Sequence, residues 1–181
     1  LVDSIHPVLK GVFSTVPGGG EARIPSSDDQ RFGLAQHHTA THLIHAALRE
    51  VMGAQVTQAG SLVDVNRLRF DFTCSKISKA QLNQINDKVN LWIAESHHVQ
   101  VHETSLDDAK SSGAIAAFGE KYDDLVRVVT IDGVPSIECC GGNHVTNTSH
   151  CDYCLIIAEF AIAAGTRRID AIVGNKRVAQ Y

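Results

Sequence analysis

Two pairs of residues, far apart in the sequence, have the side chains and the spacing of a mononuclear metal site. His38 and His42 lie four residues apart, so on a helix both imidazoles project from the same face. Cys140 and His144 form the second pair, and two glycines between them allow a tight turn that brings thiolate and imidazole to one point. Imidazole nitrogen and thiolate sulfur are ligands that Zn2+ prefers. The sequence therefore predicts a zinc site to which a helix and a turn each contribute two ligands.

The surroundings of these pairs exclude two common kinds of zinc protein. Thr39 stands where the metalloprotease motif H-E-x-x-H has its glutamate base, so peptide hydrolysis by that route is disfavoured. About 100 residues separate His42 from Cys140, whereas the ligands of a zinc finger are local. The metal is therefore expected in the cleft of a folded domain, a placement that favours catalysis.

Two further histidines near the first pair compete as ligands. His45 falls on the same helical face but lies nearly two turns from His38, so we assign it a supporting or pocket position. His37 points off that face. Asp71 and Glu138 are candidate bases, or acceptors for the ring N–H groups of the ligand histidines.

The remaining cysteines have simpler interpretations. Cys139 precedes a ligand on the same expected strand, so its side chain points to the opposite side and is expected in the core. Cys151 and Cys154, with His150, run into an apolar strand, and we favour packing over a second metal site. Five cysteines in this clustered arrangement do not resemble a secreted disulfide framework, so reduced thiols are expected.

Composition limits the class of protein. The chain has 181 residues, of which 44% are hydrophobic, enough for one core and a small appended piece. No apolar run is long enough to span a bilayer and no secretory signal pattern is visible, so we expect an intracellular protein. The chain begins at Leu1, which suggests a piece of a longer polypeptide. A net charge of -4 argues against a surface that attracts phosphate throughout, and leaves a local basic patch near the C-terminus as the candidate nucleic-acid contact.

Hydrophobic periodicity predicts the elements that position these residues. A helix is expected over 36–52, and a second helix begins at Ser78, which forms a capping box with Gln81. Ser105 caps a short helix. Strands are predicted at 55–63, 67–72, 99–103, 125–131, 136–140, 155–161 and 168–173. Helices alternating with hairpin-like strands, without regular βαβ spacing, indicate an α+β domain with a mixed or antiparallel sheet, packed helices and a metal cleft.

Several stretches together resemble the editing domain of alanyl-tRNA synthetase. They are His37-His-Thr-Ala-Thr-His-Leu, Gln58-Ala-Gly-Ser-Leu-Val, Leu68-Arg-Phe-Asp-Phe, Phe118-Gly-Glu-Lys-Tyr, Cys140-Gly-Gly-Asn-His-Val and Gly165-Thr-Arg-Arg-Ile-Asp-Ala. Free-standing alanyl-tRNA editing proteins and the threonyl-tRNA synthetase editing domain are similar. The resemblance covers about residues 31 to 175 and implies an editing domain at 31–181, preceded at 1–30 by the end of a small β-barrel. Asn143 departs from the family, which usually has Thr there.

The resemblance implies a function for the predicted site. It implies that Zn2+ is held by His38, His42, Cys140 and His144. The activity would be deacylation of tRNA(Ala) mischarged with serine or glycine, within an ATP-dependent alanyl-tRNA synthetase. Such a second sieve is needed because a site shaped for alanine cannot strongly exclude glycine or serine.

The same resemblance suggests roles for further residues. Thr41 and Gln58 match pocket positions that discriminate serine from alanine, and Arg69, Arg167 and Arg168 are the expected contacts to the acceptor end of tRNA. The alternatives are a stand-alone trans-editing deacylase, a non-catalytic tRNA-binding module with a structural zinc, and a hydrolase of small esters or amides. The expected location is the cytoplasm, or an organelle matrix or stroma if the parent protein is organellar.

Overall fold

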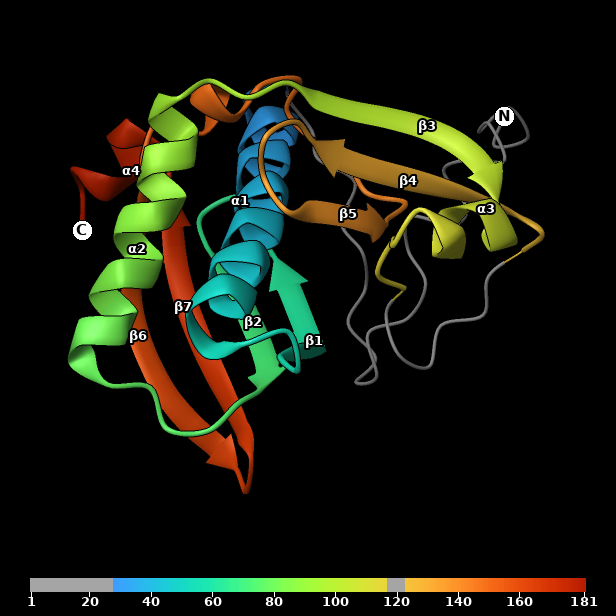
Figure 1. Ribbon diagram of the computed structural model, residues 1–181. Coiled ribbons are helices and arrows are strands. Elements are labelled where there is room, and N and C mark those ends of the chain that lie inside the picture. The colour runs from blue at the N-terminus through green and yellow to red at the C-terminus, as the bar shows by residue number, and fades with distance from the viewer. Residues whose placement is uncertain (1–27, 117–122) are drawn as a thin grey trace, which may run out of the picture.

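The computed structural model describes residues 28–116 and 123–181, which form two antiparallel sheets and a set of packed helices (Figure 1). In chain order the elements are α1 (Asp28–Met52), β1 (Thr57–Val63), β2 (Leu68–Thr73), α2 (Lys79–Ala94), β3 (Val99–Ser105), α3 (Leu106–Ser111), β4 (Leu125–Ile131), β5 (Ser136–Cys139), the 3-10 helix η2 (Thr148–Cys151), β6 (Cys154–Ala163), β7 (Thr166–Val173) and α4 (Asn175–Val178). The predicted α+β class is confirmed.

The helix α1 is the central element of the fold. It contacts α2 and η2, strands β1, β2 and β7 of the larger sheet, and strand β5 of the smaller one. In Figure 1 it stands between α2 with the larger sheet on one side and the smaller sheet on the other. Apolar residues on several sides of the helix are fully buried, among them Ala40, Leu43, Ile44 and Leu48. A helix enclosed in this way holds its side chains in fixed positions, which suits a site built on it.

The two sheets differ in size and position. The larger has the order β1-β2-β7-β6 and the smaller the order β3-β4-β5, with every strand pair antiparallel. Phe70 and Phe72 of β2 stack at a centroid distance of 5.7 Å and are fully buried. These rings form part of the core between the larger sheet and the helices.

The elements predicted from periodicity are largely confirmed. Ser78 accepts a hydrogen bond from the Gln81 N–H while the Gln81 side chain accepts one from the Ser78 N–H, so the capping box begins α2 as expected. Ser105 caps α3 in the same way through the Asp108 N–H.

The predicted start of the first helix at residue 36 is wrong. The helix α1 begins at Asp28, with Asp28 and Asp29 in its first turn, where carboxylates stabilise the positive end of the helix dipole. The apolar periodicity of its first two turns is weak, and Gly33 interrupts it. A Cβ at Gly33 would lie 2.2 Å from Nη2 of Arg177 and 3.2 Å from the Val65 carbonyl oxygen, so the helix is in close contact with other segments at this residue.

Two predictions fall on other parts of the chain. The expected barrel end at 1–30 lies outside the described residues except for its last three, which begin α1. The motif at 118–122 lies entirely outside them. Among the described helices, none is long and apolar enough to cross a membrane.

Candidate metal centre

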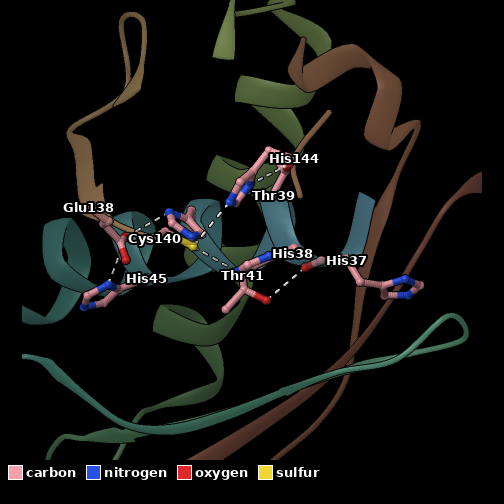
Figure 2. A network of polar contacts seen from close by, with 9 residues as sticks. His37, His38, Thr39, Thr41, His45, Glu138, Cys140 and His144 are labelled. Atoms are coloured by element: carbon pink, nitrogen blue, oxygen red, sulfur yellow. Dashed lines mark hydrogen bonds and ion pairs between the residues drawn. The ribbon is translucent and has the colours of Figure 1, made fainter. Parts of the chain in front are cut away.

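The four predicted metal ligands converge. The helix α1 supplies His38 and His42, and the segment after β5 supplies Cys140 and His144 (Figure 2). One ligand atom from each residue lies within 4.8 Å of every other. Sγ of Cys140 is 3.3 Å from Nε2 of His38 and 3.5 Å from Nε2 of His144. His42 is buried, while the other three residues are only partly buried, so the group as a whole keeps some contact with solvent.

The chemistry of this donor set fits zinc, the metal that the sequence predicts. Ligands placed tetrahedrally at zinc bond lengths of 2.0–2.3 Å are about 3.5 Å apart, close to the two Cys140 distances. Burial lowers the pKa of His38 to about 4, against a smaller opposing effect of Glu138. Burial also lowers the pKa of His144 well below its ordinary value. Both imidazoles are therefore neutral at pH 7 and have a lone pair available for a metal.

We call residues 140–144 the ligand turn, and its path requires a glycine. A Cβ at Gly142 would lie 1.8 Å from Cε1 and 2.1 Å from Nδ1 of His38. No side chain fits there without moving the His38 ring or the turn itself. Gly142 is thus needed for space, because its backbone passes directly over a ligand.

Thr39 attaches the ligand turn to α1. Its Oγ1 lies 3.1 Å from Nδ1 of His144 and accepts a hydrogen bond from the Val145 N–H at 3.2 Å. If Nε2 of His144 directs its lone pair toward the other predicted ligands, the ring proton is on Nδ1. Nδ1–H then donates a hydrogen bond to the Thr39 hydroxyl. The residue that replaces the metalloprotease glutamate therefore orients a ligand.

Glu138 contacts two histidines of α1. Its Oε1 lies 3.5 Å from Nδ1 of His42 and 3.2 Å from Nδ1 of His45. Burial favours the neutral carboxyl, but attraction to His42, His45 and His38 outweighs it, and the pKa of Glu138 is lowered. Glu138 is therefore a largely buried carboxylate next to Nδ1 of His42. His45 contacts the same carboxylate, which fits the supporting position expected for it.

His37 is turned away from the metal group, as expected (Figure 2). Its Nδ1 lies 2.8 Å from the Gly33 carbonyl, and its Nε2 accepts a hydrogen bond from the Val173 N–H at 3.1 Å. Because Nε2 faces a donor, the ring is held neutral with its proton on Nδ1. Burial lowers the pKa of His37 from 6.5 to about 4, and the hydrogen bond to Gly33 opposes this shift in part.

We expect the metal-free chain to lose stability as the pH falls from about 6.5 to about 4. The folded pKa of His37 lies below the unfolded value, so the unfolded chain takes up the proton first and is favoured over this window. The contribution of His37 is on the order of 3 kcal/mol. Urea unfolding at pH 7, 5.5 and 4.5 with a chelator present measures it. His37→Gln should weaken the pH dependence, and an unchanged dependence in this variant would contradict the assignment.

The two predicted pocket residues lie on different elements. Thr41 is buried on α1 between the two ligand histidines, and its hydroxyl donates to the His37 carbonyl at 2.9 Å (Figure 2). Its oxygen lone pairs remain to accept a bond from a substrate. Gln58 is partly buried in β1, opposite Phe72 of β2 and hence on the same side of the sheet as that core ring.

The three predicted tRNA contacts are not gathered on one surface. Arg167 lies opposite Phe72 and forms two hydrogen bonds with Glu159, so it belongs to the core side of the larger sheet. Arg168, the next residue, faces the other side. The register of β2 and β7 thus separates neighbours that the sequence places together.

Arg69 and Arg168 share the outer side of the larger sheet with Asp71. Arg168 donates from Nε and Nη2 to the two Asp71 oxygens at 2.7 and 2.8 Å, and Arg69 Nε lies 3.8 Å from the same carboxylate. Of the two candidate carboxylates, Asp71 is therefore engaged with arginines, whereas Glu138 contacts the histidines of α1. Phosphate would have to compete with these carboxylates for the guanidinium groups.

The other cysteines lie in cores. Cys139 packs with Ala109, Val126 and Val128 under the smaller sheet. Cys151 and Cys154 are fully buried, and burial raises the pKa of both thiols, with Cys154 reaching about 12. Among the described residues the only group suited to a metal is the predicted one, so a second site around His150 is not formed.

Arg127 is a residue of this site that sequence reasoning missed. Its Nη1 donates to the carbonyl oxygens of Cys140 and Gly142 at 2.8 and 2.6 Å. Within the strand predicted at 125–131, a single arginine has the pattern of an exposed strand residue. The sequence nevertheless contained a signal. The strands predicted at 125–131 and 136–140 are joined by a short turn, and their antiparallel pairing places Arg127 beside Cys140.

Comparison with known proteins identifies the family. The family described as threonyl and alanyl tRNA synthetase second additional domain matches residues 126–170. An alanine-tRNA ligase of Prochlorococcus marinus (strain MIT 9211) is 54% identical over 139 residues, which are 76% of this chain and 16% of the relative. That of Alkaliphilus oremlandii (strain OhILAs) is 46% identical over 173 residues, 95% of this chain and 20% of the relative. The chain therefore spans a fifth or less of these relatives, and it belongs to the family of alanyl-tRNA synthetase editing-region domains.

Proposed function

We propose that this domain hydrolyses the ester that joins serine or glycine to tRNA(Ala), as part of an alanyl-tRNA synthetase. One observation carries the proposal. Three imidazoles and one cysteine sulfur, all of them types of group that bind zinc, converge in a chain of this family, and three of the four residues are only partly buried. Water adds to the ester carbonyl, the bond to the ribose oxygen breaks, and the terminal ribose regains its hydroxyl. The parent synthetase would act in the cytoplasm or in an organelle matrix or stroma.

His38, His42, Cys140 and His144 would hold Zn2+ in this site. Bound zinc supplies Lewis acidity, which polarises an ester carbonyl or acidifies water. The chain's own residues would fix the ligands: Glu138 lies 3.5 Å from Nδ1 of His42, Thr39 contacts Nδ1 of His144, and the ligand turn passes over the His38 ring. Such support keeps the ring nitrogens aimed at one point before substrate arrives.

Thr41 would provide the selectivity for serine. Its hydroxyl proton is engaged by the His37 carbonyl, so the oxygen can accept a hydrogen bond from the hydroxyl of a seryl group. Alanine has no donor to offer at that point. Gln58 would complete the pocket from β1. The acceptor end would contact Arg167 on the same side of the larger sheet as Gln58, and Arg69 and Arg168 on the other side.

The test is release of serine from serine-charged tRNA(Ala) by the purified chain, with alanine-charged tRNA(Ala) and a chelated sample alongside. We expect selective release that chelation abolishes and zinc restores. A folded, zinc-loaded chain that binds tRNA but releases nothing would overturn the proposal in favour of a non-catalytic binding module. Release of small esters with the same efficiency would favour a general esterase instead.

Replacing Thr41 by valine should lower the preference for seryl over alanyl tRNA by about 5-fold, because one hydrogen bond of about 1 kcal/mol is lost. The ratio of kcat/KM for the two substrates measures this effect. Thr104→Val, in β3 of the smaller sheet, is the control and should leave the ratio unchanged. An unchanged ratio in Thr41→Val would remove Thr41 from the pocket.

A further inference from the structure

Arg127 binds the ligand turn through both its backbone and its side chain. The Cys140 N–H donates to the Arg127 carbonyl at 2.9 Å, and the Cys140 carbonyl accepts from Arg127 Nη1 at 2.8 Å. A single residue of β4 therefore holds both backbone polar groups of a predicted ligand. The same Nη1 reaches the Gly142 carbonyl at 2.6 Å, so one amino group bridges two carbonyls of the turn.

These bonds determine which way the ligand turn faces. With the carbonyls of Cys140 and Gly142 directed to Arg127, Sγ of Cys140 lies 3.3 Å from Nε2 of His38. The backbone at Gly142 lies so close to the same ring that it leaves no room for a Cβ. A turn with two glycines has many conformations of its own, and a bridge between two of its carbonyls removes most of them.

The charge of Arg127 strengthens this arrangement. Burial lowers the pKa of its guanidinium, while attraction to Cys140 and Glu103 opposes that shift, and an arginine keeps its charge at neutral pH. Hydrogen bonds from a charged donor are stronger than those between neutral groups. The positive charge also lies close to the sulfur that must be a thiolate to bind a metal.

We propose that Arg127 is a positioning residue of the metal centre, which holds Cys140 and Gly142 so that the turn can deliver its two ligands. The proposal rests on the proposed function for the identity of the metal. The hydrogen bonds of Arg127 go to the backbone of the ligand turn rather than to a ligand atom, so its effect is expected first in metal affinity and coordination and only through them in hydrolysis.

The chain contains a matched control for this role. Arg49, near the end of α1, donates from Nη1 to the carbonyls of Ala54 and Val56 at 2.6 and 3.0 Å. This is the same contact, one amino group on two carbonyls two residues apart, made to a turn that carries no predicted ligand. Replacing either arginine by methionine removes the bridge between two carbonyls of a turn. Only Arg127→Met removes such a bridge from the predicted metal site.

The experiment measures metal binding alone. Zinc affinity is determined by competition with a chromophoric chelator, and cobalt replaces zinc so that the thiolate-to-metal charge-transfer band and the visible bands report coordination. We expect Arg127→Met to bind zinc about 10-fold more weakly with an altered cobalt spectrum, and Arg49→Met to match wild type in both. If Arg127→Met does not fold, Arg127→Gln, which reaches at most one carbonyl, should show the same changes to a smaller degree.

Wild-type affinity and spectrum in the Arg127 variants would overturn the proposal, as would equal losses in Arg49→Met, which would indicate general loosening. These readouts need no tRNA. A wild-type chain that binds zinc normally but does not deacylate would therefore contradict the proposed function, while the role of Arg127 in metal binding could still be tested. A wild-type chain that binds no zinc would contradict both the proposed function and the role of Arg127.

Discussion

A chain with alanine in place of Cys140 should bind zinc at least about 100-fold more weakly than wild type and lose the proposed deacylase activity. Sγ of Cys140 lies 3.3 and 3.5 Å from Nε2 of His38 and of His144, and it is the one sulfur atom among the predicted ligands. A site of four ligands contributes about 10 kcal/mol or more of binding free energy, so removal of its one charged ligand costs several kcal/mol. Chelator competition and serine release from mischarged tRNA(Ala) measure the two effects.

Cys139→Ala is the matched control, because the preceding cysteine has the opposite orientation. It packs with Val126 and Val128 in the core of the smaller sheet. We expect this variant to keep zinc affinity and activity while losing about 1 kcal/mol of stability from weaker packing. If Cys139→Ala lost the metal and Cys140→Ala kept it, the assignment of the ligand would be wrong.

Alanine at Gly142 should lower zinc affinity by about 10- to 100-fold and reduce deacylation accordingly. The added Cβ would lie 1.8 Å from a ring carbon of His38, far inside contact distance, so the ring or the turn must move by more than the tolerance of a metal site. Isothermal titration with zinc and the cobalt spectrum report the displacement directly.

Gly60→Ala provides the comparison for this variant. Its Cβ would meet only Asp71, at ordinary contact distances of 3.7 and 3.8 Å, so zinc binding should remain that of wild type. Normal zinc affinity in Gly142→Ala would show that the turn and the His38 ring separate at no cost, and that the close approach is not required for the site.

The sequence was sufficient for features that depend on spacing along the chain. A separation of four residues on a helix puts His38 and His42 on one face whatever surrounds them. The capping box at Ser78 is likewise local, and the structure confirms it. Opposite faces for Cys139 and Cys140 followed from the period of a strand alone.

Other features depend on register between segments, which local patterns do not specify. Arg167 and Arg168 are neighbours in sequence, but pairing of β7 with β2 places one opposite Phe72 and the other opposite Asp71, on different sides of the sheet. That pairing brings Asp71 to Arg168, and pairing of β7 with β6 brings Glu159 to Arg167. The start of α1 also escaped prediction, because its first two turns carry little apolar periodicity and Gly33 contacts Arg177, near the other end of the chain.

The candidate metal ligands could therefore be identified from the sequence, whereas the contacts that would support them depend on the tertiary structure. Ligand type and helical or turn spacing are properties of short segments, so they could be read from the residues themselves. Arg127, Glu138 and Thr39 act across contacts between elements, where the choice of partner depends on how the sheets pack around α1. Many sequences share such side chains, and only the packed fold shows which of them reach the site.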